Sequence, residues 1–167
     1  MKAFKTVGIQ YAALPFRIEG RQVKILLITS RTTRRWVIPK GWPIRGLKPQ
    51  EAAAVEAVEE AGIAGEIADH PIGSYDYLKR LKGEQATAVQ VIVFPFRVDE
   101  QSDDWKERHQ RTFCWVDHRK AAAMVAEPGL KRLIRHLGLA RSPGLLAHGV
   151  RSFHAWRSVA RARPAMG

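Results

Sequence analysis

Residues 41–63 read GWPIRGLKPQEAAAVEAVEEAGI, and this stretch carries the strongest structural signal in the chain. It predicts a helix over Pro49–Ala61, because proline suits the first turn of a helix and Gly62 stands where a C-terminal cap belongs. Pro39 and Pro43 flank the start of the stretch, so residues 39–43 are expected to be irregular. The sequence therefore predicts a single helix with a defined beginning and end.

Three glutamates fall on one face of this predicted helix. With an advance of about 100° per residue, Glu56, Glu59 and Glu60 lie within one arc, opposite a face of small apolar side chains. No lysine or arginine stands between Glu51 and Gly62 to pair with them, and the negative end of the helix dipole disfavours Glu59 and Glu60. An ordinary solvated acidic face would explain neither feature. A bound cation would, and Mg²⁺ suits such oxygen ligands.

The same stretch resembles the Nudix box, G-x5-E-x7-R-E-U-x-E-E-x-G-U, in which U is a bulky aliphatic residue. The 23 residues align without a gap, and the matching positions are Gly41, Glu56, Glu59, Glu60, Gly62 and Ile63. Two positions depart outright, with Leu47 in place of glutamate and Val55 in place of arginine, and Ala57 departs mildly at the first U. Residues 36–41, WVIPKG, resemble the residues that lead into the box in the branch of the family that contains diphosphoinositol polyphosphate and diadenosine polyphosphate hydrolases.

The resemblance implies a pyrophosphohydrolase that cleaves a diphosphate linked to another moiety, with Mg²⁺ as the cofactor or Mn²⁺ in its place. It gives Glu59 and Glu60 the role of principal metal ligands, and Glu56 the role of a third ligand or of the base. Some relatives take a base from a loop outside the box. Glu107 is the candidate for that base, although a residue of this kind is more often an ordinary surface glutamate.

Val55 supports a different interpretation. In the family, the box arginine helps to hold the catalytic glutamates, and a valine cannot do this. The alternative is therefore a catalytically weak or inactive Nudix-fold module that binds a nucleotide or RNA.

Basic residues before the box are candidates for binding the substrate phosphates. They are Arg31, Arg34 and Arg35 in one loop, and Lys40 beside Gly41. Arginine can grip phosphate oxygens with two parallel hydrogen bonds, and lysine adds a point charge. A solvated basic loop explains the three arginines equally well.

The order of predicted elements indicates an α/β (α+β) fold. We expect a Nudix-type α/β/α sandwich, in which helices flank a mixed sheet, over residues 1–140. The predicted strands are residues 6–14 and 23–28, joined as a hairpin, a short apolar piece at 36–38, and residues 72–78, 87–98 and 112–116. Residues 99–111 are expected to form a loop, and two further helices are predicted at residues 119–126 and 129–139.

Residues 141–167 form a basic extension that the box does not predict. They contain five arginines and no acidic residue, and their apolar residues recur with near-helical spacing. Three interpretations stay open. The extension is a helix docked on the body or on a second copy in a homodimer, an amphipathic helix at an anionic membrane surface, or a nucleic-acid contact.

Composition limits the remaining choices. The net charge of +12 attracts phosphate-rich partners, so we expect a small phosphorylated substrate and regard nucleic acid as the less favoured partner. The single cysteine, Cys114, excludes an internal disulfide, and the apolar stretch 88–96 is too short to span a bilayer. The first residues lack the apolar stretch of a secretory signal, and we expect a cytoplasmic protein.

Overall fold

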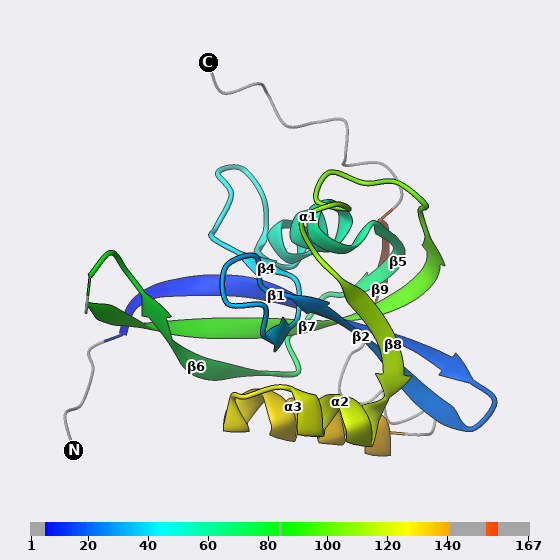
Figure 1. Cartoon of the computed structure of the whole chain (residues 1–167). Coiled ribbons are helices and arrows are strands. Elements are labelled where there is room, and N and C mark those ends of the chain that lie inside the picture. The colour runs from blue at the N-terminus through cyan, green and yellow to red at the C-terminus, as the bar shows by residue number, and fades with distance from the viewer. Residues whose placement is uncertain (1–5, 84, 141–152, 157–167) are drawn as a thin grey trace.

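Two long strands, β1 (Thr6–Glu19) and β7 (Ala86–Gln101), run parallel at the centre of a mixed sheet (Figure 1). The computed structural model describes residues 6–83, 85–140 and 153–156. All other pairs of strands are antiparallel within this part of the chain. Strands β2 (Gln22–Thr29) and β4 (Lys40–Gly41) pair with β1. Strands β3 (Trp36–Val37) and β8 (Phe113–Asp117) pair with β2. Strands β5 (Ile63–Ala68) and β6 (Gly73–Arg80) pair with β7, and β9 (Phe153–Trp156) pairs with β5.

Helices cover both faces of the sheet. Helix α1 (Pro49–Ala61) packs against β1 and β5 on one face, and α2 (His118–Met124) and α3 (Pro128–Leu139) cover the other (Figure 1). This arrangement confirms the predicted α/β/α sandwich. Among the described residues, none of the helices has the length and apolar character needed to cross a bilayer.

Strand β2 shows how the sequence divides the core between the two faces. Successive side chains of a strand point to opposite faces. Val23, Ile25 and Leu27 lie in the core beneath α2 and α3, whereas Leu26 and Ile28 lie in the core beneath α1. Both sets are almost fully buried, which is why this strand reads as a continuous apolar run.

Helix α1 approaches the sheet through small side chains. Ala53, Ala54 and Ala57 are fully buried in the core on this face. At the N-terminus the backbone N–H of Lys48 donates to Oε2 of Glu51, at 2.8 Å. At the C-terminus Gly62 has φ 65°, the left-handed conformation that glycine adopts most readily. The predicted bounds of this helix are confirmed.

Most other predicted elements are confirmed with shifted bounds, the largest shift being in β1, which continues to Glu19 instead of ending at residue 14. Two expectations are corrected, and one strand was missed. Residues 39–43 are not wholly irregular, because Lys40–Gly41 pairs with β1. The expected loop at 99–111 begins only after Gln101, where β7 ends. Strand β5 was not predicted, because Ile63–Ala68 is short, contains Gly65 and directly follows a helix.

The basic extension is described only at Phe153–Trp156. These residues form β9, which pairs antiparallel with β5, so the expected helical conformation is wrong for them. The remainder of 141–167 lies outside the described residues, and the interpretations given for it stay predictions.

Candidate functional site

Glu56, Glu59 and Glu60 lie in the C-terminal half of α1 and line one open cleft of about 1450 Å³. Glu60 is buried, whereas Glu56 and Glu59 are partly exposed. Gly41, in β4, faces the helix so closely that a Cβ atom there would overlap the carboxyl group of Glu56. The first glycine of the motif is therefore needed for space, and it brings β4 against the acidic face.

The carboxylate of Glu60 is held at both of its oxygens. Oε1 lies 3.0 Å from Nη2 of Arg111, and Oε2 accepts a hydrogen bond from the backbone N–H of Lys40 at 3.3 Å. The pKa of Glu60 is raised to about 8, chiefly by burial and also by the nearby carboxylates of Glu56 and Glu107, against the opposing charges of Arg111 and Lys40. The protein's own cations therefore leave the ionised form of Glu60 incompletely stabilised.

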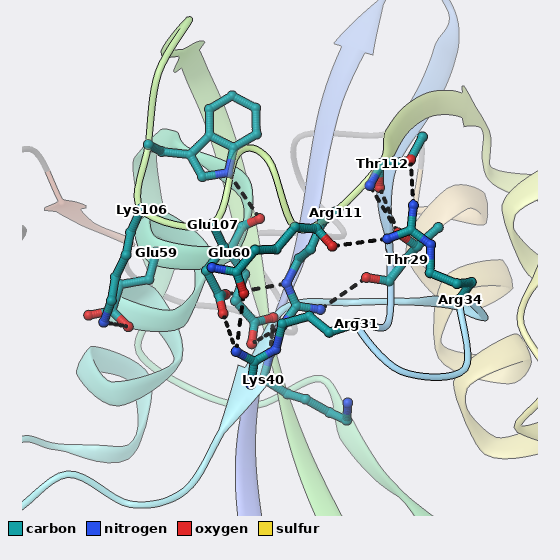
Figure 2. A network of polar contacts seen from close by, with 12 residues as sticks. Thr29, Arg31, Arg34, Lys40, Glu59, Glu60, Lys106, Glu107, Arg111 and Thr112 are labelled. Atoms are coloured by element: carbon teal, nitrogen blue, oxygen red, sulfur yellow. Dashed lines mark hydrogen bonds and ion pairs between the residues drawn. The ribbon is translucent and has the colours of Figure 1, made fainter.

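Arg111 joins three parts of the molecule (Figure 2). Besides Glu60, its Nε lies 3.3 Å from Oε2 of Glu107, and its Nη1 donates to the carbonyl oxygen of Thr29 at 3.0 Å. Only 8% of its side chain is exposed. Sequence reasoning did not identify this residue, because it lies in a polar run without periodicity.

Residues 102–112 form a loop that lies against the last turn of α1. The backbone N–H of Glu107 donates to the carbonyl of Glu59 at 3.1 Å, and the indole N–H of Trp105 donates to the carbonyl of Glu60 at 3.2 Å. A Cβ atom on Gly62 would overlap the Trp105 ring. Because the last carbonyls of a helix have no partner within it, these contacts fix the loop to the end of the acidic helix.

Glu107 is buried, so the expectation of an ordinary surface glutamate is wrong. It is 9% exposed, and its Oε1 lies 3.1 Å from Nη1 of Arg31. Glu59 is at the edge of the same network, where its Oε2 lies 3.2 Å from Nζ of the exposed Lys106 (Figure 2). The structure thus brings Glu107 beside the glutamates of α1, 47 or more positions away along the chain.

The arginines of the loop before β3 have different surroundings. Arg31 and Arg35 line the cleft, and Nη1 of Arg35 lies 3.2 Å from Oε1 of Glu127. Arg34 is outside the cleft lining, since its guanidinium donates to the carbonyl of Gln110 at 3.0 Å and to Oγ1 of Thr112 at 3.1 Å. Two of the three arginines are therefore placed to meet a ligand, and the third braces the loop.

Lys40 and Gly41 line the same cleft as the acidic helix. Together with Arg31 and Arg35, Lys40 forms the basic side of this cleft, which we call the basic rim. The ammonium of Lys40 is 5.2 Å from the centre of the Tyr77 ring. Burial lowers the pKa of Lys40, while Glu60 and Glu127 oppose this effect. Further basic residues line the same cleft, namely Lys79, Arg80 and Lys106. An acidic helix face and a basic rim therefore share one cavity, as a site for a cation and a phosphorylated ligand requires.

A profile of the NUDIX domain matches residues 9–137 of this chain. The chain belongs to the Nudix family. Nudix hydrolase 17, mitochondrial, from Arabidopsis thaliana is 33% identical over 96 residues, which are 58% of this chain and 50% of that protein. Diphosphoinositol polyphosphate phosphohydrolase 3-alpha from Mus musculus is 31% identical over 100 residues, 58% of this chain and 54% of that protein.

The chain thus spans about half the length of these Nudix relatives. Among solved structures, an Ap4A hydrolase from C. elegans has a TM-score of 0.58 at 20% identity, over 82% of this chain and 100% of that one. Likeness at this level of identity shows the shared fold, a mixed sheet between helices.

Nudix enzymes generally use divalent metal ions, and the carboxylates of the cleft are the residues that would hold one here. Within the described part of the chain, no three acidic, histidine or cysteine side chains converge on one point closely enough to hold an ion. Mg²⁺ needs only one or two carboxylates, because it keeps several waters and is completed by substrate phosphates. Glu60 is a buried carboxylate whose ionised form Arg111 and Lys40 stabilise only in part, and Glu56 is near it. The donor set therefore fits a hard divalent ion.

Proposed function

We propose that this Nudix protein is a Mg²⁺-dependent hydrolase, with Mn²⁺ able to replace Mg²⁺. Its reaction is cleavage of a phosphoanhydride bond in a nucleoside diphosphate-linked compound or a polyphosphorylated small molecule. Dinucleoside polyphosphates and inositol pyrophosphates are the two substrate classes that we favour, and the names of the C. elegans and mouse relatives point to the same two classes.

The observation that carries this proposal is the shared cleft. Glu56, Glu59 and Glu60 line it from α1, and Arg31, Arg35 and Lys40 line it from the segment before the helix. An acidic pocket alone would repel a polyphosphate, and a basic pocket alone would not hold a divalent ion. Only the combination suits a metal-bound phosphoanhydride.

Each group has a proposed role. A divalent ion held by one or two of the carboxylates of Glu56, Glu59 and Glu60, and completed by water and phosphate oxygens, would withdraw charge from the phosphate oxygens and lower the pKa of a bound water. Arg31 and Arg35, whose side chains are 59% and 46% exposed, would bind the phosphates through their outward-facing donors. We leave Arg34 out of this phosphate site because its donors are used within the loop.

Two residues are candidates for the base that accepts a proton from the attacking water. Glu56 lies in the cleft beside Gly41. Glu107 also lines the cleft, but each of its oxygens takes an ion pair, with Arg31 and with Arg111. Acting as the base would therefore require Glu107 to exchange one arginine for water.

A second function is favoured by one residue. Val55 is 6% exposed and packs in the core beneath α1, so no arginine occupies the box position next to Glu56. If that support is indispensable, the chain is a nucleotide-binding module with little or no turnover. Such a module would still bind phosphates through the basic rim.

Hydrolysis of a substrate panel separates the two functions, and it is measured as the release of nucleotides, sugar phosphate or inorganic phosphate according to the substrate. The panel contains dinucleoside polyphosphates, nucleoside diphosphate sugars and an inositol pyrophosphate, each with Mg²⁺, Mn²⁺ or EDTA. We expect metal-dependent release that is lost in Glu59→Gln and Glu60→Gln. Glu66→Gln is the matched control, because Glu66 pairs with Arg97 away from the cleft lining. Saturable nucleotide binding without release from any substrate would contradict the hydrolase and support the binding module.

A further inference from the structure

Helix α1 contains no residue that can support its own glutamates. Between Glu51 and Gly62 the sequence has no basic side chain, and Val55 packs among apolar residues of the core. A ligand carboxylate that is free to rotate holds a metal poorly, and polar partners that fix such ligands are a general feature of metal sites. Support for Glu60 must therefore come from another element.

Arg111 makes the contacts that such a support requires. Each of its three guanidinium nitrogens contacts a different partner. Nη2 lies 3.0 Å from Glu60, Nε lies 3.3 Å from Glu107, and Nη1 donates to the carbonyl of Thr29 at 3.0 Å. A guanidinium is planar and carries its donors in fixed directions, so these contacts define the orientation of the Glu60 carboxylate. With 8% of its side chain exposed, Arg111 is also poorly screened by solvent.

The backbone around Arg111 is itself anchored. Next to it, the N–H of Thr112 donates to Oγ1 of Thr29 at 2.9 Å, and the N–H of Thr29 donates to the carbonyl of Thr112 at 2.9 Å. Thr29 ends β2, a strand in the centre of the sandwich. Arg111 therefore transmits the fixed position of the sheet to the end of α1.

We propose that Arg111 is a positioning residue for Glu60, and that it supplies from the loop the support that α1 lacks at Val55. The inference rests on the proposed function, because the orientation of Glu60 matters only if this carboxylate binds a metal. A carboxylate has about four lone-pair sites. Oε1 can thus receive Arg111 while other lone pairs remain for an ion.

Mn²⁺ binding, followed by electron paramagnetic resonance of the free ion, tests this role without any substrate. The variants are Arg111→Gln, which removes the charge, and Arg111→Lys, which keeps it without the fork. Arg108→Gln is the matched control, because Arg108 belongs to the same loop but lies over the rings of Trp105 and Phe113. We expect Arg111→Gln to weaken Mn²⁺ binding about 10- to 100-fold. Arg111→Lys should have an intermediate effect, and Arg108→Gln should bind as the native protein does.

Kinetics on a substrate of the native protein give a second readout. Loss of a positioning residue should lower kcat by a larger factor than it raises KM, because Arg31 and Arg35 keep their own side chains, although Glu107 links Arg111 to Arg31. A double variant, Val55→Arg with Arg111→Gln, tests compensation directly. Provided that it melts at the native temperature, it should recover part of the lost Mn²⁺ affinity, and a folded double variant that recovers none would contradict compensation.

The outcomes separate this inference from the proposed function. Native protein that binds no Mn²⁺, either alone or together with a non-hydrolysable dinucleoside polyphosphate, would overturn both. Native binding combined with equal or tighter binding by a folded Arg111→Gln would overturn the positioning role alone, since Arg111 would then only neutralise Glu60. An equal loss in Arg108→Gln would also overturn it, because the loop as a whole would be responsible. If Arg111→Gln does not fold, Arg111→Lys decides, and native affinity in that variant overturns the inference.

Discussion

On one face of the sheet, α3 buries large aliphatic side chains such as Leu130 and Ile134, whereas on the other face α1 buries alanines and, in its last turn, the carboxylate of Glu60. Full burial of a leucine or isoleucine contributes about 1.5–3 kcal/mol, but an alanine methyl contributes much less. Burial of a carboxylate opposes folding unless its charge is compensated. Helix α3 therefore contributes more apolar burial than α1, whose last turn accommodates charge, while large sheet residues such as Phe96 and Ile67 stabilise the core beneath α1.

The small side chains of α1 have a further consequence. They let the helix lie close to the sheet, and the same closeness places Gly41 against the Glu56 carboxyl group. A larger interface would have given more stability and a wider gap. The comparison teaches that α3 mainly holds the fold together, whereas the end of α1 carries residues that we propose to do its chemistry, and substitutions in each helix should show that separation.

The largest expected effect is that of Glu60→Gln on turnover. Removing a buried ligand charge should lower kcat/KM about 1000-fold, which corresponds to ~4 kcal/mol. The melting temperature should stay the same or rise, since the variant buries an amide in place of a carboxylate whose ionised form is poorly stabilised. Kinetics measures the loss of turnover, and thermal melting of the same preparation measures the change in stability. A variant that keeps native turnover would break the proposed division of roles.

On the opposite face, Ile134→Ala should act on stability alone. Ile134 is fully buried, and truncation of such a side chain destabilises by about 2–5 kcal/mol. Urea unfolding measures the loss, and Mn²⁺ affinity at a temperature where the variant is still folded should equal that of the native protein. Weakened metal binding in the folded variant would show that the two faces are coupled.

The pH dependence of stability should differ between native protein and Glu60→Gln in the absence of metal. The pKa of Glu60 rises from 4.5 to about 8 in the folded state. Between these values the folded protein binds more protons than the unfolded chain, so this group's stabilising contribution is complete below pH 4.5 and is lost as pH rises towards 8.

The native protein should therefore lose up to ~1.4 kcal/mol of stability per pH unit, relative to the variant, in this window. Urea unfolding of both proteins at the two ends of the window gives the difference. Parallel pH profiles would show that Glu60 is ionised in the folded state without help from a metal.

The smallest expected effect is that of Gly41→Ala. No positive φ restricts this position, so the only conflict is the overlap of the new methyl group with Glu56. Displacement of that carboxylate should weaken Mn²⁺ binding about tenfold, the lower end of the range for disturbed metal-site geometry. Calorimetric titration measures the affinity, and melting controls for the fold. Native affinity in a folded variant would mean that Glu56 is not a ligand.

Sequence reasoning succeeded where the signal is local. The bounds of α1 and the common face of Glu56, Glu59 and Glu60 follow from helical periodicity and from proline and glycine at the ends. The departure at Val55 was visible as well. Its consequence was not, because Arg111 meets Glu60 through a loop that has no repeating pattern and lies 51 positions away.

The structure differs from the sequence prediction in two further segments, and in both the cause is a contact with a distant part of the chain. Strand β5 exists because Ile63–Ala68 pairs with β7, and its small residues give only a weak strand signal of their own. The near-helical spacing of the basic extension predicted a helix, yet Phe153–Trp156 is a strand paired with β5. In both segments a partner strand overrides the local preference.

The most direct test is a crystal structure with Mn²⁺ and a non-hydrolysable dinucleoside polyphosphate, with the metal located by its anomalous scattering. We predict an anomalous peak bonded to the Glu56 and Glu60 carboxylates at the end of α1, with phosphate oxygens between that peak and the Arg31 and Arg35 side chains. A bound polyphosphate with no metal beside α1, or a metal held elsewhere, would contradict the claim that these glutamates form the metal site.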